Sequence, residues 1–192
     1  PGHTLTGEQL CAAVGAAIGQ PALRARPLPW AWMRLAAVLE LLPGALEAQL
    51  KRDSDLSHFE YWVLAMLSEA PERTLRMSVL ASRTSATLPR LSHVVQRMED
   101  RGYIERVACP SDRRATNARL TDVGWEKVVT AAPGHVENVR EQVVDRLTVE
   151  QLDELTVIAD RILMQLSPDT AAWINGYTRD ADAQPAACTE VA

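Results

Sequence analysis

Residues 87–102, TLPRLSHVVQRMEDRG, decide the fold of this chain. Thr87 is a favoured N-cap residue, Pro89 falls in the first turn where a missing N–H costs nothing, and Gly102 can adopt a positive φ. The stretch is therefore predicted to form one helix with both ends marked. Its apolar residues recur every three or four positions and form a single stripe: Leu88, Leu91, Val94 or Val95, and Met98.

The other faces of this helix carry Arg90, Ser92, His93, Gln96 and Arg97. Arginine, serine, histidine and glutamine are side chains that contact phosphates and base edges in a major groove. A solvated amphipathic helix that binds nothing has the same pattern, so the stretch alone does not decide between the two interpretations. The flanking sequence favours DNA binding.

On both sides the flanks complete a DNA-binding motif. Residues 75–84, LRMSVLASRT, predict a short helix, and residues 85–86 make a tight connection, which together give a helix-turn-helix. Downstream, residues 103–108 alternate as a strand does, with Ile104 on one face, and residues 117–121 are a second extended segment. The loop between them, CPSDRRAT, is polar and bears arginines. A hairpin with a basic tip after a helix-turn-helix predicts a winged helix-turn-helix, whose wing reaches a minor groove.

Four blocks of the chain resemble, in order and with the right spacing, the multiple-antibiotic-resistance-regulator (MarR) family of transcription factors. They are LRMSVLASRT, RLSHVVQRMEDRGYIER, CPSDRRAT and LTDVGWEKV, and the third carries the wing signature Asp-x-Arg at Asp112 and Arg114. The resemblance covers roughly residues 30–166. It implies a mainly α fold with a small β-hairpin wing, in which a winged helix-turn-helix domain is joined to a helical dimerisation region.

The resemblance also implies a homodimer that binds double-stranded DNA. In MarR-like proteins the first and last helices of two subunits interlock, and each recognition helix contacts one half of a pseudo-palindromic operator. The apolar faces of residues 30–53 and 121–166 agree with this, because a small winged domain alone cannot cover them. We expect the two recognition helices to lie about 34 Å apart, one turn of DNA.

The chain is expected to divide into three parts. These are an N-terminal extension at residues 1–29 with a short helix at 6–18 and a linker, a MarR-type domain at residues 30–166, and a disordered tail at residues 167–192. Within the domain, the winged helix-turn-helix occupies about residues 57–121, and the dimerisation helices occupy about residues 30–53 and 121–166. Capping boxes at Ser57 and Thr148 open two of the helices, and Pro133 is expected to bend the long helix after the wing without ending it.

Charge is unevenly distributed along the 192 residues. The net charge is −5, yet residues 76–119 hold nine arginines against four carboxylates, a net charge of +5, so the remainder carries −10. A basic module in an acidic frame suits a protein that contacts DNA with one surface. No apolar run approaches the roughly 18 residues of a membrane span, so a cytoplasmic protein is expected.

Enzymatic and metal-binding functions find no support in the sequence. The four histidines share no metal-ligand spacing, no glycine-rich phosphate loop is present, and no serine or cysteine lies in a nucleophile motif. The three cysteines, Cys11, Cys109 and Cys188, are far apart and lack CxxC spacing, so they are expected to be free thiols. No catalytic residue, cofactor or metal is therefore expected.

Arg90 is the first choice for a contact to a base edge. It lies near the start of the recognition helix, and arginine paired with guanine is the commonest specific contact, although a phosphate contact is the alternative. The resemblance places Thr87, Ser92 and His93 at the groove or its phosphates, whereas His93 is alternatively a structural residue on the helix flank. Arg97 completes the set predicted on this helix, and Pro89 replaces a serine found in many relatives.

The wing contributes the other predicted DNA contacts. Arg114 is expected to enter the minor groove, and Asp112 is expected to orient it, because a carboxylate near phosphates is repelled. Arg113 occupies a position that is often glycine in relatives, where it adds a phosphate contact or stiffens the loop.

Regulation by a ligand is the expectation that the resemblance favours, with repression released by a small aromatic or phenolic molecule held where the dimer helices meet the winged domain. Two alternatives remain: a redox-responsive regulator that acts through Cys109, and a winged-helix interaction protein without operator specificity. The candidate ligand-binding residues are Trp30, Met33, His58, Trp62 and Arg76. For each of them, packing in the core is the slightly favoured alternative.

Overall fold

The computed structural model describes residues 28–109 and 112–183 of the chain. Contacts between Cα atoms divide the chain into two units, Pro1–Ala45 and Leu46–Ala192. The helix and linker predicted within residues 1–27 lie outside the described residues. None of the described helices is both long and apolar enough to span a bilayer.

Of the first unit, the structure describes residues 28–45, which are the first part of α2 (Leu28–Ser54). This helix starts two residues earlier than predicted. Pro43 lies inside α2 and does not end it. Six large apolar side chains in this part of α2 are more than half exposed: Trp30, Trp32, Met33, Val38, Leu39 and Leu41.

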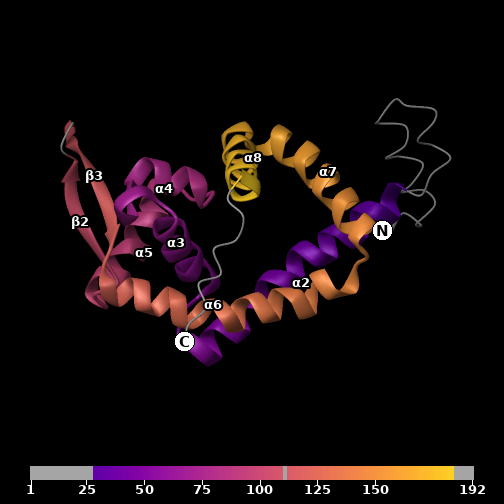
Figure 1. Ribbon diagram of the computed structural model, residues 1–192, viewed down its shortest axis with the longest axis horizontal. Coiled ribbons are helices and arrows are strands. Elements are labelled where there is room, and N and C mark those ends of the chain that lie inside the picture. Colours follow the sequence, from indigo (N-terminus) through magenta and orange to yellow (C-terminus); the bar gives the residue numbers. More distant parts are fainter. Residues whose placement is uncertain (1–27, 110–111, 184–192) are drawn as a thin grey trace, which may run out of the picture. The chain divides into compact units, whose positions relative to one another are not determined.

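The second unit contains the winged helix-turn-helix (Figure 1). Its elements are α3 (His58–Ser68), η2 (Pro71–Arg73), β1 (Thr74–Arg76), α4 (Met77–Arg83), α5 (Leu88–Asp100), β2 (Ile104–Cys109) and β3 (Asp112–Leu120). The three strands are antiparallel in the order β1-β3-β2, and Figure 1 shows the β2–β3 hairpin standing next to α4 and α5. The predicted fold class, mainly α with a small β wing, is therefore confirmed.

Two boundaries in the predicted motif were wrong, one in the first helix and one in the second strand of the wing. The sequence pattern placed Leu75 and Arg76 in a helix, whereas they form β1 and pair with Ala118 and Asn117 of β3. Leu75 is buried in the core at this position, so pairing with a strand some 40 residues away overrides the local helical pattern. The sheet consequently has three strands. Its long strand β3 begins at Asp112, inside the segment that was predicted as a loop, and not at residue 117.

The ends of α5 match the sequence signals. The Thr87 hydroxyl accepts a hydrogen bond from the Arg90 backbone N–H, and Gly102 has a φ of 75°. The N–H of Tyr103 donates to the carbonyl of Met98, which is the 6→1 bond of a Schellman motif. Both ends of the recognition helix are thus fixed by local hydrogen bonds, as predicted.

Side chains of α5 are part of the hydrophobic core. Leu91, Val95 and Met98 are fully buried, and each such side chain stabilises the fold by about 1.5–3 kcal/mol. Val94 is buried as well, whereas Leu88, the first residue of the helix, which the sequence placed on the same stripe, is half exposed. The core therefore holds α5 by one face and leaves the rest of its surface outside.

After the wing, α6 (Asp122–Gln142) begins at the N-cap Thr121 and continues through Pro133, as predicted. It ends before a short turn, η3 (Val144–Arg146), so it is shorter than the apolar pattern indicated. The next helix, α7 (Val149–Leu166), opens with the predicted capping box at Thr148. None of the residues of α7 is buried.

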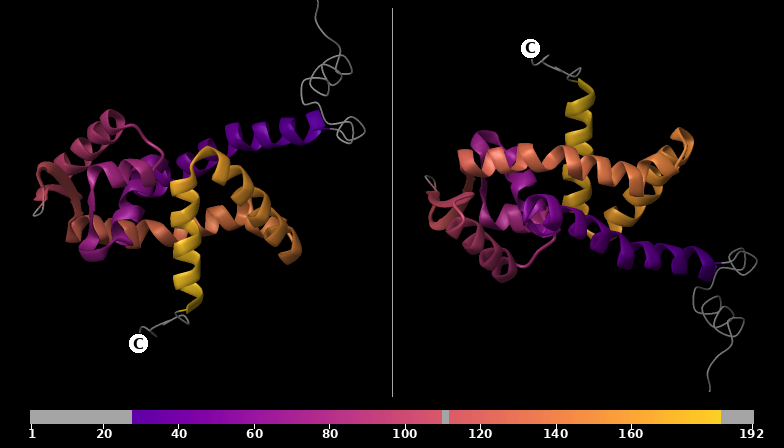
Figure 2. Two further views of the ribbon diagram at one scale, coloured as in Figure 1. Left: turned by 90° about the horizontal axis from the view of Figure 1, so that it is seen from above. Right: turned by 90° about the horizontal axis from the view of Figure 1, so that it is seen from below.

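The prediction of a disordered tail was wrong for residues 168–183, which form α8 (Pro168–Ala183). The Ser167 hydroxyl accepts a hydrogen bond from the Thr170 N–H at 3.4 Å and so caps the helix. Ala171 is fully buried, and Trp173 packs against the core, which gives this small and polar segment an anchor. Figure 2 shows α7 and α8 as two helices that meet at a bend. Residues 184–192 lie outside the described part of the chain.

Candidate nucleic-acid interface

The outward face of α5 can be assigned from its buried face. Successive residues are rotated by about 100° around a helix axis, so the side opposite Leu91, Val95 and Met98 begins at Pro89 and continues through His93. Pro89 and His93 are both exposed. The centre of the outward face near the helix N-terminus is therefore occupied by a proline and a histidine, with arginines on its flank.

Two arginines on one flank of α5 contact α3. Arg90 and Arg97 are seven residues apart and so lie above one another. The Arg90 guanidinium carbon lies 4.5 Å from the centre of the Phe59 ring. Arg97 donates to the Glu60 carboxylate at 3.2 Å, yet its side chain remains 61% exposed, which leaves it accessible to a phosphate.

Glu60 joins the start of α3 to α5. Its carboxylate accepts hydrogen bonds from the Ser57 backbone N–H at 2.8 Å and the Ser57 hydroxyl at 2.9 Å, in addition to the bond from Arg97. Burial alone would raise the pKa of this carboxyl, but the hydrogen bonds from Ser57 and Arg97 outweigh burial and lower the pKa below its ordinary value. The carboxylate is therefore charged at neutral pH and holds the recognition helix against α3.

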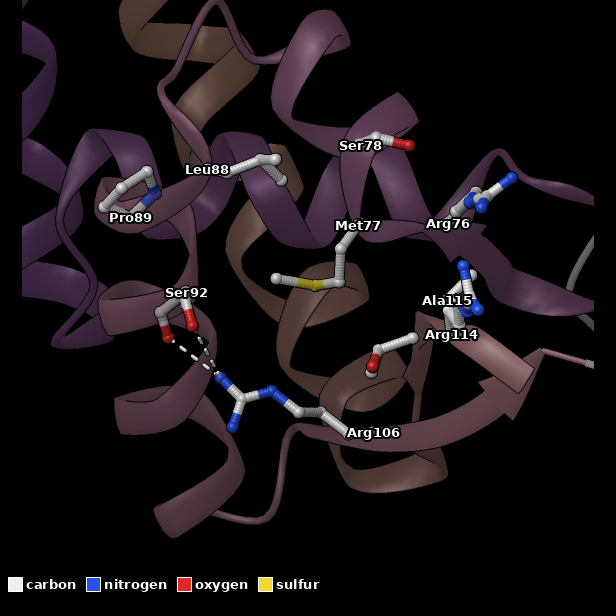
Figure 3. A pocket seen from close by; sticks show the side chains of 10 residues that line it. Arg76, Met77, Ser78, Leu88, Pro89, Ser92, Arg106, Arg114 and Ala115 are labelled. Atoms are coloured by element: carbon white, nitrogen blue, oxygen red, sulfur yellow. Dashed lines mark hydrogen bonds between the residues drawn. The ribbon is translucent and has the colours of Figure 1, made fainter. Parts of the chain in front are cut away.

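On the other flank, Arg106 fastens β2 to α5. One terminal nitrogen of its guanidinium donates to Gln96 at 2.6 Å and to Glu99 at 3.1 Å. The other donates to the Ser92 carbonyl at 3.0 Å and to the Ser92 hydroxyl at 3.3 Å (Figure 3). Sequence reasoning did not single out Arg106. The available signal was strand alternation, which places Arg106 on the same face as the buried Ile104 and so implies a partner for its charge.

A hollow of about 510 Å³ lies between the beginnings of α4 and α5 and the wing strands. Figure 3 shows Arg76 and Arg114 on one side of it and Ser92 with Arg106 on the other. The lining contains three arginines, of which Arg106 is paired with Glu99 behind it, and no carboxylate, so the hollow favours a negatively charged group such as phosphate. Its remaining lining residues are Met77, Ser78, Leu88, Pro89, Ala115 and Thr116.

The tip of the wing is described in part. The pairing register shifts between Ala108, which pairs with Thr116, and Cys109, which pairs with Asp112, so the ladder is irregular near the end of the hairpin. Arg114 lies in β3, four residues before Ala118, and its side chain is exposed. The side chains of Asp112 and Arg113 lie outside the described part of the structure.

Thr87 is placed at the interface by its role as a cap. Its side chain is exposed, and its oxygen accepts the hydrogen bond from the Arg90 N–H. A hydroxyl that accepts one hydrogen bond can still donate another, so the cap does not prevent a contact to DNA phosphate.

The five predicted ligand-binding residues are distributed over both units of the chain. His58 and Trp62 are neighbours, with ring centroids 6.3 Å apart, and His135 of α6 lies 5.9 Å from His58. Arg76 lines the hollow at the wing, and Trp30 and Met33 belong to the other unit. Burial lowers the pKa of both His58 and His135, so these two rings are neutral at pH 7. Among the described residues, no group of three or more His, Cys, Asp or Glu could hold a metal ion.

Comparisons with known proteins agree with this geometry. The MarR family pattern matches residues 54–115. Sco3205, a MarR family transcriptional regulator from Streptomyces coelicolor whose crystal structure is a complex with DNA, is 37% identical with a TM-score of 0.72, over 86% of this chain and 96% of that chain. AbsC, a MarR family transcriptional regulator from the same organism, is 33% identical with a TM-score of 0.70, over 88% of this chain and 100% of that chain.

A third relative matches over a shorter segment. YdcH, an HTH-type transcriptional regulator of Bacillus subtilis (strain 168), is 35% identical over 81 residues, which cover 41% of this chain and 55% of YdcH. This chain therefore spans about half the length of that relative. The likeness to the two Streptomyces proteins extends over nearly their whole lengths. The chain thus belongs to the MarR family of transcriptional regulators.

Proposed function

We propose that the chain is a homodimeric regulator that binds a specific DNA operator, represses transcription there, and releases the operator when a small molecule binds. The observation that carries this proposal is the basic hollow beside α5, lined by Arg76, Arg106 and Arg114 without any carboxylate. The likeness to Sco3205, which was solved in complex with DNA, supports the same interpretation.

In this proposal α5 enters the major groove by its N-terminal half. Arg90 contacts a guanine, His93 lies over the centre of the groove, and Thr87, Ser92 and Arg97 contact phosphates or adjacent base edges. The wing follows the neighbouring minor groove, where Arg114 inserts, Asp112 orients it, and Arg113 adds a phosphate contact.

The exposed apolar surface of α7 supports the proposed dimer. Apolar patches of this kind on a soluble protein mark an interface, because leaving them in water is unfavourable. A two-fold dimer places two recognition helices about 34 Å apart, which fits a pseudo-palindromic operator. The exposed apolar residues of α7 are Val149, Leu155, Val157, Ile158, Ile162, Met164 and Leu166.

For the effector, we place an aromatic or phenolic molecule near His58 and Trp62, with Trp30, Met33 and Arg76 as further candidates. The rings of His58 and Trp62 provide an aromatic surface, and Nδ1 of the nearby His135 is buried without a hydrogen-bond partner among the described residues. A molecule that binds the DNA-incompatible dimer more tightly lowers operator affinity by that difference. Adding simple phenols and benzoic acids to the protein–DNA complex should lower its anisotropy, and Trp62→Ala should weaken this effect.

Fluorescence-anisotropy titration tests DNA binding directly. The full chain is titrated onto its own upstream intergenic DNA and onto a scrambled duplex, at two salt concentrations. Arg90→Ala should lose sequence preference, and Arg114→Ala should bind both duplexes more weakly, with a salt slope that is smaller by about 0.9 for each phosphate that the side chain neutralises. The matched control is Arg119→Ala. Arg119 lies on the same strand as Arg114, but its side chain is paired with Glu105 at 2.8 Å. Equal and weak binding of the unmodified chain to both duplexes would refute the proposal.

A further inference from the structure

The only phenylalanine of the chain, Phe59, lies in the first turn of α3 and contacts the residue that we place on a base edge. Its ring is partly buried and packs against the core, so its position is fixed. The guanidinium carbon of Arg90 lies 4.5 Å from the centre of this ring, within the range of a cation–π contact.

This contact differs from those of neighbouring arginines. Arg97 and Arg106 donate N–H groups to carboxylates, which uses their hydrogen-bonding edges and offsets their charge. Among the described residues, the Arg90 side chain has neither a carboxylate nor a hydrogen-bond partner, and its guanidinium rests on the Phe59 ring. The face of an aromatic ring attracts the cation without accepting its N–H donors along their edge. The donors of Arg90 that a guanine would require are therefore left available.

The backbone of Arg90 is fixed as well. Its N–H donates to the Thr87 hydroxyl at 3.4 Å, which ties the residue to the N-cap of α5. One end of this long side chain is thus held by the helix cap, and its guanidinium is held by an aromatic ring. An arginine that is already held in place loses less rotamer freedom when it binds than one that moves in water.

We propose that Phe59 is a positioning residue for base recognition, which holds the Arg90 guanidinium at the edge of α5 with its N–H donors free for a guanine. This inference rests on the proposed function, in which Arg90 contacts a base. Phe59 itself does not touch DNA; it acts through Arg90. Specificity is therefore expected to depend on an aromatic ring in α3 as well as on the recognition helix.

The size of the effect follows from the strength of an exposed cation–π contact. Such a contact corresponds to about a two- to fivefold effect on an equilibrium constant. A two-fold dimer makes the contact once in each half-site, so removing the ring should weaken specific binding by about 4- to 25-fold. Binding to a scrambled duplex should stay unchanged, because no charge is removed.

The test compares Phe59→Leu, which keeps an apolar side chain, with Phe59→Tyr, which keeps the ring. Full-length protein is titrated onto the upstream intergenic duplex and onto a scrambled duplex, at two salt concentrations and in backgrounds with and without Arg90→Ala. We expect Phe59→Leu to lower the ratio of specific to non-specific affinity by the stated factor without changing the salt slope. Phe59→Tyr should keep the ratio of specific to non-specific affinity at the value of the unmodified chain. In the Arg90→Ala background, Phe59→Leu should have no further effect, because the residue that it positions is already gone.

Two results would overturn the inference while leaving the proposed function intact. One is an unchanged specificity ratio in Phe59→Leu, and the other is an equal loss in the presence and absence of Arg90, which would mean that Phe59 acts only through the fold. Equal affinity of the unmodified chain for both duplexes would instead refute the proposed function itself. Circular dichroism establishes that each variant is folded, and Phe59→Met replaces Phe59→Leu if the latter unfolds, because methionine fills irregular gaps without a ring.

Discussion

Replacing Arg106 with alanine should destabilise the fold and reduce DNA discrimination together, because a single guanidinium joins β2 to the recognition helix. It donates to Gln96 at 2.6 Å, to Glu99 at 3.1 Å and to the Ser92 carbonyl at 3.0 Å. The Arg106 side chain is only 26% exposed, so water screens these contacts weakly. Its removal leaves the Glu99 carboxylate without its cation and frees α5 from the wing.

The magnitude can be worked from these contacts. Hydrogen bonds to charged groups contribute about 1.5–3 kcal/mol each, but the bonds of one side chain share its entropy and do not add. We therefore expect Arg106→Ala to lower the free energy of unfolding by about 2–3 kcal/mol. The matched control, Arg119→Ala, removes a side chain of the same kind from the neighbouring strand. Its ion pair with Glu105 is shorter, at 2.8 Å, but the Arg119 side chain is 47% exposed, so its loss should cost less than about 1 kcal/mol.

Urea unfolding followed by circular dichroism measures both values, with the protein concentration held constant because the stability of a dimer depends on it. Arg106→Lys keeps the charge but not the planar fork that reaches Gln96 and Ser92 at once, so it should recover less than half of the loss. Anisotropy titration of the same variants should show a lower specificity ratio for Arg106→Ala and an unchanged ratio for Arg119→Ala. Equal losses of stability in these two alanine variants would refute the view that Arg106 ties the wing to α5.

Three further predictions concern the fold around this surface. Since the folded-state pKa of Glu60 is lowered, the charged carboxylate should stabilise the protein above the unfolded pKa of about 4.5, and this contribution should be lost as the pH falls through the folded value. In urea titrations, the difference in unfolding free energy between the unmodified chain and Glu60→Gln should therefore shrink between pH 7 and pH 3. A constant difference would contradict the role of the ion pair between Glu60 and Arg97. Gly124→Ala should lower the melting temperature sharply, because an added Cβ would overlap a backbone carbonyl oxygen, whereas Gly176→Ala, where nothing lies within 4 Å, should leave it unchanged or raise it slightly. Trp173→Ala should release α8 from the core and open residues 168–183 to limited proteolysis, and an unchanged cleavage pattern would argue that the helix is anchored elsewhere.

What the sequence predicts correctly is local. Local hydrogen bonds that span only a few residues determine the N-caps at Ser57, Thr87 and Thr148 and the positive φ of Gly102. The residue types at these positions therefore predict them. The passage of α6 through Pro133 belongs to the same class, because a proline removes one backbone hydrogen bond and leaves the rest of a long helix in place.

The errors concern elements whose partners are distant in the sequence. Leu75 lies in β1 because it pairs with Ala118, and no local pattern contains that information. The helix α8 was predicted as disorder from its small and polar residues, yet the burial of Ala171 and the packing of Trp173 supply an anchor that composition cannot reveal. In each case tertiary contacts decide the structure of a segment whose own propensity is weak.

The same distinction governs the basic block at residues 76–119. Sequence alone counts its nine arginines as one charged surface, with a net charge of +5. In the structure the carboxylates of Glu60, Glu99 and Glu105 bind some of these arginines, so a salt dependence calculated from all nine would be too steep. Among the remaining arginines, Arg90 rests on an aromatic ring, and Arg76 and Arg114 border the hollow beside the wing. An arginine that secures the fold and an arginine that borders the proposed DNA surface look alike in the sequence, and Arg106, which binds Glu99 and also lines the hollow, has both positions.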